Sequence, residues 1–248
     1  MSKGVAIAPF ERELHEGMVG RDVVAVKRAL QARRRGSISN RTHVFGPGAV
    51  KAVKQLQKAH GRPQTGIYDK PTHSLLAPFF DAYGVWLLMH SQPDLPARRR
   101  LVMAGLALLN YHHATGRMHY TESPDRMTIV RHKLKPPFRR VIYEDCSSFI
   151  AGCFFLAGLP DPNGQGYNGR GYTGTLGEHG HVVSRPFPGD ITLYPSKKAP
   201  RWPWGHTTLA IGDDLSKPAT RCLSHGDEGD PIVLAIDYRR IGEHRSFL

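Results

Sequence analysis

The pattern of apolar residues changes once along the chain, and this change constrains the fold more than any other feature. Up to about Gly158, apolar side chains group at helical spacing or in runs long enough for buried helices. After Pro188-Gly189-Asp190 the chain instead carries the short runs ITLYP, HTTLAIG, TRCLSH and PIVLAIDY, which are rich in β-branched or aliphatic residues and separated by turn residues. Helices followed by strands predict an α+β fold.

Residues 10–80 are predicted to form a small domain of three short helices. The first helix carries apolar residues on one side: Val23, Val26 and Leu30. A second helix from Gly48 repeats this spacing. A third is expected over Pro71–Leu76, because proline is tolerated in a first helical turn and Asp69 stands just upstream as a cap.

The helical pattern breaks up between Pro78 and Pro96, where QPDLPARRR has the composition of a junction. We therefore expect a linker over 81–96 and a second domain over 97–248. This second domain begins with a largely buried helix that contains Leu101, Val102, Leu106, Leu108 and Leu109. A long glycine-rich segment separates the helical part from the strands.

The chain is strongly basic. Lysine and arginine number 34 against 21 aspartates and glutamates, so the surface carries a positive field at neutral pH. Nucleic acids and the anionic polymers of a cell wall would both be attracted by such a field. No helix-turn-helix, zinc-finger or RNA-binding motif is present. We therefore expect a wall polymer as partner and no nucleic acid, with a merely solubilising charge as the alternative.

Three cysteines cannot all pair, and this usage suits a reducing compartment. The apolar start of the chain is too short for a signal peptide, and no apolar run approaches the roughly 20 residues of a membrane span. We expect synthesis in the cytoplasm, no membrane insertion, a monomer and no cofactor.

Cys146 stands where a proline-bounded loop gives way to the apolar segment SSFIAGCFFLAG, so its sulfur should lie in the first turn of a helix. There the helix dipole and free backbone N–H groups favour the thiolate, which is the nucleophilic form. Cys153 follows two turns later among phenylalanines and is expected to be an inert core residue.

Two histidines are candidates for the base. His206 opens the run GHTTLAIG and His225 ends the run RCLSH, and adjacent antiparallel strands can bring two such side chains together. One would take the thiol proton, and the other would hold its ring in the required tautomer. The 14 histidines also raise a zinc hydrolase as an alternative, but H-E-x-x-H is absent and Cys222 and His225 should point to opposite faces of a strand. We therefore expect no metal.

Three segments in the first third of the chain share their order and several residues with a known family. They are GMVGRDVVAVKRAL, VFGPGAVKAVKQLQKAHG and TGIYDKPTHSLL, and together they resemble the peptidoglycan-binding domain found beside many wall hydrolases. Thr65 and Asp69-Lys70 depart from that family, which often has Asp and Gly-Pro at these places. The resemblance implies a helical domain that binds peptidoglycan; a bundle that merely docks on its neighbour is the alternative.

Three later motifs follow one another in order: Asp145-Cys146-Ser147-Ser148-Phe149, Pro188-Gly189-Asp190-Ile191 and Gly205-His206-Thr207-Thr208-Leu209. They resemble the NlpC-like cysteine peptidases, which have a papain-like α+β fold with an antiparallel sheet. The resemblance implies Cys146 as nucleophile, His206 as base and His225 as the third residue. Asp227 is the fallback for the third position, because the segment between the two histidines is long.

The same resemblance implies substrate contacts from four residues: Tyr120, Asp145, Ser147 and Tyr172. The glycine-rich segment from Asn163 to Gly177 is expected to line the substrate cleft through Tyr167, Tyr172 and Thr173.

Both resemblances together imply a phage endolysin, made in the host cytoplasm and acting on the wall after release. It would cut an amide of the peptidoglycan stem peptide, with the bond between D-glutamate and the diamino acid as the first expectation. The alternatives are an N-acetylmuramoyl-L-alanine amidase and a non-catalytic wall-binding protein.

Overall fold

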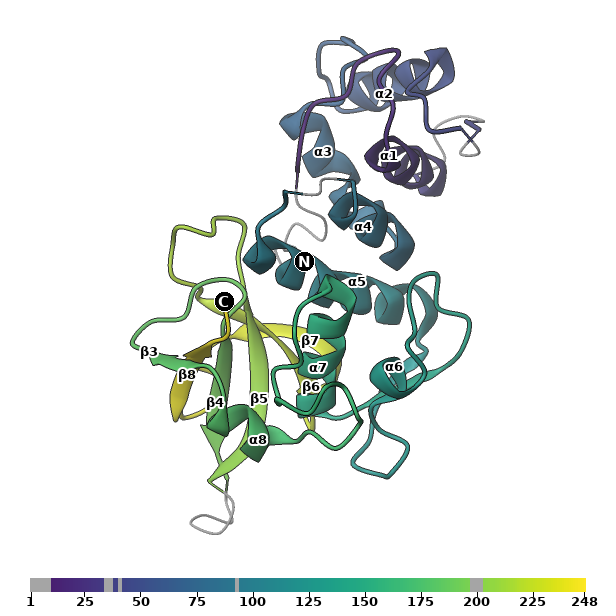
Figure 1. The fold of residues 1–248 in the computed structure, drawn as a ribbon. Helices are drawn as coiled ribbons and strands as arrows, with labels where there is room; N and C mark the ends of the chain where they lie inside the picture. Colours follow the sequence, from purple (N-terminus) through teal and green to yellow (C-terminus); the bar gives the residue numbers. More distant parts are fainter. Residues whose placement is uncertain (1–9, 34–37, 40–41, 92–93, 197–202) are drawn as a thin grey trace. The chain divides into compact units, whose positions relative to one another are not determined.

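The structure is a computed structural model of the 248-residue chain, and it describes residues 10–33, 38–39, 42–91, 94–196 and 203–248 (Figure 1). The chain divides into two compact units, an N-terminal unit that ends at Asp94 and a C-terminal unit that begins at Leu95. Within the described ranges, no helix is both long enough and apolar enough to cross a membrane.

The N-terminal unit is helical. It contains α1 (Arg21–Ala32), α2 (Pro47–Ala59), α3 (Lys70–Leu76), a 3-10 turn (Ala77–Phe79) and α4 (Ala82–Met89). The three helices predicted from the sequence are present. Asp69 caps α3 by accepting a hydrogen bond from the Thr72 amide at 2.8 Å. The apolar residues that the spacing placed on one side of each helix are buried, among them Val23, Val26, Leu30, Val53 and Leu56.

The expectation of a linker over 81–96 is wrong for its first half, which is helical. Residues Ala82–Met89 form α4, which packs against α1 and belongs to the N-terminal unit. Asp81 starts this helix, because its side chain accepts a hydrogen bond from the Gly84 amide at 2.7 Å and also pairs with Arg28 of α1. The apolar residues of α4 therefore complete a core. Residues 92–93 of the expected linker lie outside the described ranges.

The helices of the C-terminal unit precede most of its strands in the chain. They are α5 (Ala97–Thr115), α6 (Thr128–Arg131), α7 (Cys146–Ala157) and α8 (Thr173–Glu178). Between them, β1 (Met118–Tyr120) and β2 (Ile142–Glu144) pair in parallel. α5 packs along α7, and its leucines are buried as the sequence predicts.

Within residues 94–196 and 203–248, six strands form one antiparallel sheet in the order β3-β8-β4-β5-β6-β7. The strands are β3 (His181–Val183), β4 (Ile191–Pro195), β5 (Trp204–Ile211), β6 (Arg221–Gly226), β7 (Gly229–Ala235) and β8 (Glu243–Ser246). α7 packs against the strands β5 and β6, and α5 packs against β7 (Figure 1). The α+β fold with an antiparallel sheet is confirmed.

One face of this sheet is covered by helices. Leu209 of β5 and Leu223 of β6 are paired in the register, and both side chains lie beside Gly105 of α5. Cys153 of α7 lies at the same place, fully buried and in the core as predicted. We call this side of the sheet the helix face.

The opposite face carries tyrosines. Because side chains alternate along a strand, Ala210 and Cys222, the next pair in the register, point away from the helices. They cluster with Ile236 and Tyr238 from the chain that follows β7. We call this side the tyrosine face.

Candidate active site

Cys146 is the first residue of α7, as predicted. Asp145 caps the helix by accepting a hydrogen bond from the Ser148 amide at 2.6 Å, and the Ser148 hydroxyl accepts one from the Asp145 amide at 2.7 Å. This reciprocal capping box satisfies two backbone donors and defines the helix start. It also gives Ser148 a structural role.

Asp145 and Ser147 hold the helix start together, and their contact with substrate stays a prediction. The Ser147 side chain is buried and its hydroxyl donates to Asp145 at 2.8 Å. Arg126 pairs with the other carboxylate oxygen of Asp145 at 2.9 Å. Both oxygens of Asp145 are therefore engaged within the protein, and the pair positions Cys146.

Cys146 is 6% exposed, and its sulfur lies 3.7 Å from the Thr173 hydroxyl oxygen. The backbone N–H groups of Ser147 and Thr207 also face the sulfur. Burial raises the pKa of the thiol to about 12, helped by the Asp145 charge and only partly opposed by these hydrogen-bond donors. The thiol is therefore protonated at neutral pH, and the surrounding N–H groups are placed to stabilise negative charge that develops beside it.

His225 ends β6 on the helix face. Its ring packs against Tyr120 at 5.8 Å and against Phe149 of α7 at 5.6 Å between ring centroids. The side chain is fully buried, and within the described residues neither ring nitrogen has a hydrogen-bond partner. Burial lowers the pKa of His225 to about 4, although the Asp230 carboxylate opposes this shift. The ring is therefore a neutral imidazole without a hydrogen bond of normal geometry, and the backbone of His119 lies near enough to favour its charged form.

Tyr120 connects this histidine with the cysteine. Its ring contacts His225, and its hydroxyl donates to Glu122 at 2.8 Å. Burial raises the pKa of the phenol, and the nearby Glu122 and Cys146 side chains raise it further. Tyr120 thus lies in the same cluster as Cys146 and His225, and its contact with substrate stays a prediction.

His206 lies on the tyrosine face. Its Nε2 atom is 2.9 Å from the Ser224 hydroxyl and 3.1 Å from the Glu228 carboxylate. Its ring also packs near Tyr194 and Tyr238, with centroids 5.7 and 6.4 Å away. His206 is buried and, unlike His225, held by polar partners.

Glu228 is the centre of this polar group. It accepts hydrogen bonds from the Tyr238 hydroxyl at 2.7 Å and from Arg239 at 2.6 Å, and Ser224 also donates to it. Burial would raise the pKa of Glu228, but the hydrogen bonds from His206, Ser224 and Tyr238 outweigh burial and hold it well below its usual value. The carboxylate therefore stays ionised and anchors His206.

The expected pairing of His206 with His225 is not formed, because the two side chains project from opposite faces of the sheet. The expected fallback, Asp227, is exposed and makes no hydrogen bond with His206 among the described contacts. Its neighbour Glu228 makes that contact instead. In the sequence, Asp227 and Glu228 stand next to each other in a turn after His225. Only the geometry of that turn shows that Glu228, and not Asp227, points toward His206.

The glycine-rich segment contributes one side chain to the cysteine cluster. Thr173, the first residue of α8, reaches Cys146, whereas Tyr167 packs against Phe155 and donates to the Leu159 carbonyl at 2.6 Å. Tyr167 is thus a packing residue, which corrects its expected place in the cleft. Tyr172 precedes Thr173 and is 39% exposed, so its contact with substrate stays a prediction.

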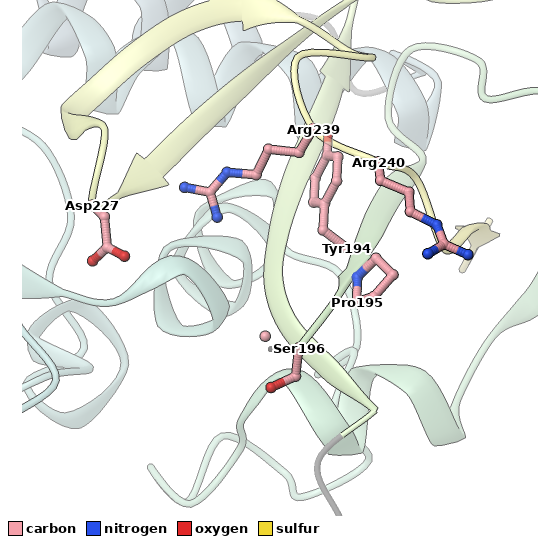
Figure 2. A pocket seen from close by; sticks show the side chains of 7 residues that line it. Tyr194, Pro195, Ser196, Asp227, Arg239 and Arg240 are labelled. Carbon is pink, nitrogen blue, oxygen red and sulfur yellow. The ribbon is translucent and has the colours of Figure 1, made fainter. Parts of the chain in front are cut away.

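A pocket of about 710 Å³ opens near the ends of β4 and β5 (Figure 2). Its lining consists of Tyr194, Pro195, Ser196, Gly205, Asp227, Arg239 and Arg240. Gly205 precedes His206, and Arg239 is bound to Glu228. The pocket therefore borders the polar group around His206.

No metal site is evident in the part of the chain that the structure describes, because no three His, Cys, Asp or Glu side chains gather there as ligands. Cys222 lies on the tyrosine face and His225 on the helix face. They thus point to opposite faces, as their spacing predicts.

The N-terminal unit has a buried polar centre of its own at Gln57. Its amide donates to Thr65 Oγ1, the Ile67 carbonyl and Thr72 Oγ1, at 3.0 to 3.2 Å, and its carbonyl accepts from the Gly66 amide at 3.0 Å. Gln57 thereby ties α2 to the segment that leads into α3. Thr65, where related domains often have Asp, takes part in this network.

Comparison with curated proteins gives no match, and comparison with solved structures gives none either. Residues 19–76, less than a quarter of the chain, match a family model described as a putative peptidoglycan binding domain. This range begins just before α1 and ends with α3. The N-terminal unit therefore carries a peptidoglycan-binding domain, which connects this protein with the bacterial cell wall.

Proposed function

We propose that the C-terminal unit hydrolyses an amide bond of peptidoglycan, with Cys146 as the nucleophile and His225 as the base. The observation that carries this proposal is a thiol at a helix start on the same side of the sheet as a buried imidazole whose nitrogens are both unpaired. Buried polar atoms without partners are rare, and a catalytic role is one of the few reasons to retain them.

In the reaction, the sulfur of Cys146 attacks the carbonyl carbon of the amide while its proton passes to an imidazole nitrogen of His225. The backbone N–H groups of Ser147 and Thr207, which face the sulfur, stabilise the negative charge on the carbonyl oxygen. The C–N bond then breaks and the departing amine takes the proton from His225. Water then attacks the carbonyl carbon of the resulting thioester while His225 accepts a proton from it. The C–S bond breaks, and the leaving sulfur takes this proton from His225 to restore the thiol.

The resting pair is neutral. The Cys146 thiol has a pKa near 12 and His225 one near 4, so the proton stays on sulfur until the carbonyl is in place. Asp230 favours the charged form of His225, and its carboxylate accepts a hydrogen bond from the Tyr120 amide at 3.0 Å. We assign Asp230 the role of stabilising the imidazolium once it forms.

His206 is the base implied by the resemblance to NlpC-like peptidases, and the structure supports a different role for it. Its Nε2 atom is bound to Ser224 and Glu228 on the tyrosine face, where it borders the pocket. We propose that His206 shapes this pocket. The assignment of the base can therefore be tested separately from the assignment of the nucleophile.

The bond that we propose is the amide between D-glutamate and the diamino acid of the stem peptide, with the muramoyl-L-alanine amide as the alternative. From the resemblances to peptidoglycan-binding domains and NlpC-like peptidases, we also propose that this hydrolase is a phage endolysin. A peptidoglycan-binding domain on the same chain raises the local concentration of the catalytic unit on an insoluble substrate.

The test compares wild type with Cys146→Ala on purified cell walls. Wild type should release new amino groups, and mass spectrometry of the muropeptides identifies the bond, whereas Cys146→Ala should release none. Cys153→Ala, a substitution in the same helix but in the core, is the matched control and should retain activity. Equal release by wild type and Cys146→Ala contradicts Cys146 as the nucleophile, and no release by either protein leaves a wall-binding protein. Activity that is lost in EDTA indicates a zinc hydrolase instead.

A further inference from the structure

The positive charge of the C-terminal unit is concentrated in its first third. Residues 95–143 contain ten arginines and lysines but only two acidic residues, Glu122 and Asp125, whereas residues 144–248 contain ten basic and twelve acidic residues. Because charges of both signs are mixed in the later stretch, their fields largely cancel there. The net positive charge of this unit therefore comes from residues 95–143.

Six of these cations belong to one surface around the loop that joins α6 to β2. All six are exposed, and none of them forms an ion pair among the described contacts. Only two of the six use their guanidinium groups within the protein, to donate to backbone carbonyls. We call this set the basic surface, and it consists of Arg117, Arg131, Lys133, Lys135, Arg139 and Arg140.

The loop that carries this surface is held in place by its backbone and its apolar residues. The Tyr111 hydroxyl of α5 donates to the Arg140 carbonyl at 2.7 Å, and the ring of Phe138 packs 5.0 Å from that of Tyr111. The Leu134 amide donates to the Ile129 carbonyl at 2.9 Å. Since these contacts anchor the loop to α5 and α6, its charged side chains are presented to solvent from a defined backbone.

Such a surface is complementary to a polyanion, because neutralising a row of negative charges releases the counterions of the polymer. Residues 131–140 have no large apolar side chain that is exposed and could insert into a lipid bilayer. Phe138 packs on Tyr111 and is therefore not available to stack on a nucleobase. The matched peptidoglycan-binding domain connects the same chain with the cell wall. These observations favour a polyanion of the wall over a membrane or a nucleic acid.

We propose that the basic surface binds the phosphodiester groups of a polyol phosphate polymer attached to the cell wall. The C-terminal unit then has a wall contact of its own, in addition to the N-terminal domain. The loop runs into β2, which ends two residues before Cys146, so the contact lies in the segment that leads to the proposed nucleophile. The inference does not depend on hydrolysis, because it concerns binding alone.

The test measures co-sedimentation of the full-length Cys146→Ala protein with purified walls that carry a polyol phosphate polymer. The substitution keeps the walls intact under the proposed mechanism. The walls are used as purified and after treatment with hydrofluoric acid, which cleaves phosphodiesters and leaves the peptidoglycan. At low salt, untreated walls should bind the protein about tenfold more tightly or better than treated walls, since several phosphate contacts are lost on treatment.

Two triple variants in this background separate the basic surface from net charge, because each removes three exposed cations of the C-terminal unit. They are Lys135→Gln/Arg139→Gln/Arg140→Gln in the basic surface and Arg170→Gln/Arg185→Gln/Arg240→Gln outside it. The first should lose most of the preference for untreated walls. Its log affinity should also depend less steeply on log salt, by about 2, because each contact with a flexible polyanion contributes about 0.7. The second should keep both the preference and the salt dependence.

Circular dichroism and thermal unfolding verify that both triple variants are folded. Equal binding to treated and untreated walls overturns the inference, and so does an equal loss of preference in the two variants. Single-stranded DNA and vesicles of anionic lipid serve as competing probes at the same salt concentration. If either binds more tightly than untreated walls and is weakened by the basic-surface variant, the surface belongs to that partner and the wall polymer is wrong. Hydrolysis of walls by wild type, present or absent, leaves this result unchanged.

Discussion

His206 and His225 occupy neighbouring strands of one sheet, yet their surroundings are opposite. His206 lies on the tyrosine face with Ser224 and Glu228 bound to its ring, whereas His225 lies on the helix face with neither ring nitrogen paired. Both are almost fully buried, so exposure does not distinguish them. The difference shows that partners, and not burial, separate a held histidine from one that is free to accept a proton.

The strand register produces this difference. Leu209 of β5 pairs with Leu223 of β6, and continuing that register places His225 opposite Thr207 and His206 opposite Gly226. Residues opposite each other share a face, so the two histidines are on different faces. A shift of the pairing by one residue would bring both to the same face, because side chains alternate along a strand.

The largest effect is expected from His225. His225→Ala should lower the rate of wall hydrolysis by about 10³-fold, since loss of a general base typically costs 10² to 10⁴. His206→Ala should retain more activity, because its ring is on the other face. Initial rates of amine release from purified walls measure both. If His206→Ala abolishes activity and His225→Ala does not, the base is His206 and the helix-face assignment is wrong.

The second prediction concerns how the free energy of unfolding changes with pH because of His225. The pKa of His225 is about 4 in the folded protein and about 6.5 in an unfolded chain, so between these values only the unfolded chain binds the proton. The stabilising contribution is therefore complete above pH 6.5 and is lost as the pH falls toward 4, on the order of 3 kcal/mol in total. His225→Phe should lack this loss.

Glu144 changes the pH dependence of the unfolding free energy in the opposite direction to His225. Wild type must therefore be compared with a variant that keeps Glu144. Burial raises its pKa to about 7, so its contribution is present below the unfolded value of 4.5 and is lost as the pH rises through 7. The measurement is therefore the difference in unfolding free energy between wild type and His225→Phe, from urea titrations at pH 7, 5.5 and 4.5. A difference that does not change with pH contradicts the neutral, buried state of His225.

Glu228→Gln is expected to have an intermediate effect on the tyrosine face. The variant removes the charge that holds His206, Tyr238 and Arg239, and it should lower the unfolding free energy by about 2 kcal/mol, as for other buried charged hydrogen bonds. Asp227→Asn is the neighbouring control and should stay within about 0.5 kcal/mol of wild type. Equal values for the two variants, from urea unfolding at pH 7, would mean that Glu228 is not the anchor.

The smallest effect is expected from Gly226. A methyl group added there would lie 2.6 Å from Cε1 of His206, so Gly226→Ala should displace the ring and cost about 1 kcal/mol. The His206 imidazole signals in an NMR spectrum should shift while those of His225 change little. Gly48→Ala in α2, where the structure leaves open space, serves as control and should not destabilise. Unchanged His206 signals contradict the packing of this ring over Gly226.

Local signals explain what could be predicted. Helical spacing located α1 and α2, Asp69 marked the start of α3, and the change to short β-branched runs marked the sheet. α4 was missed because it is apolar on most sides and short, so its pattern showed no single buried side; its cap, Asp81, was the available signal. The sequence does not predict the internal hydrogen bonds of Ser147 and Asp145, because they depend on the helix start and on Arg126, which is distant in the chain.

Short-range patterns in the chain predict the helical N-terminal unit with its peptidoglycan-binding motifs, the α+β order of the C-terminal unit and the position of Cys146 at a helix start. These features depend on residues close together in the chain, where caps and periodicity act directly. Three features are visible only in the folded protein: the face that each histidine occupies, the binding of His206 by Glu228 and not Asp227, and the direction in which burial shifts the pKa values of Cys146 and His225. The physical reason is that register and burial arise from contacts between distant segments, and a one-residue change in pairing reverses the face of every side chain in a strand.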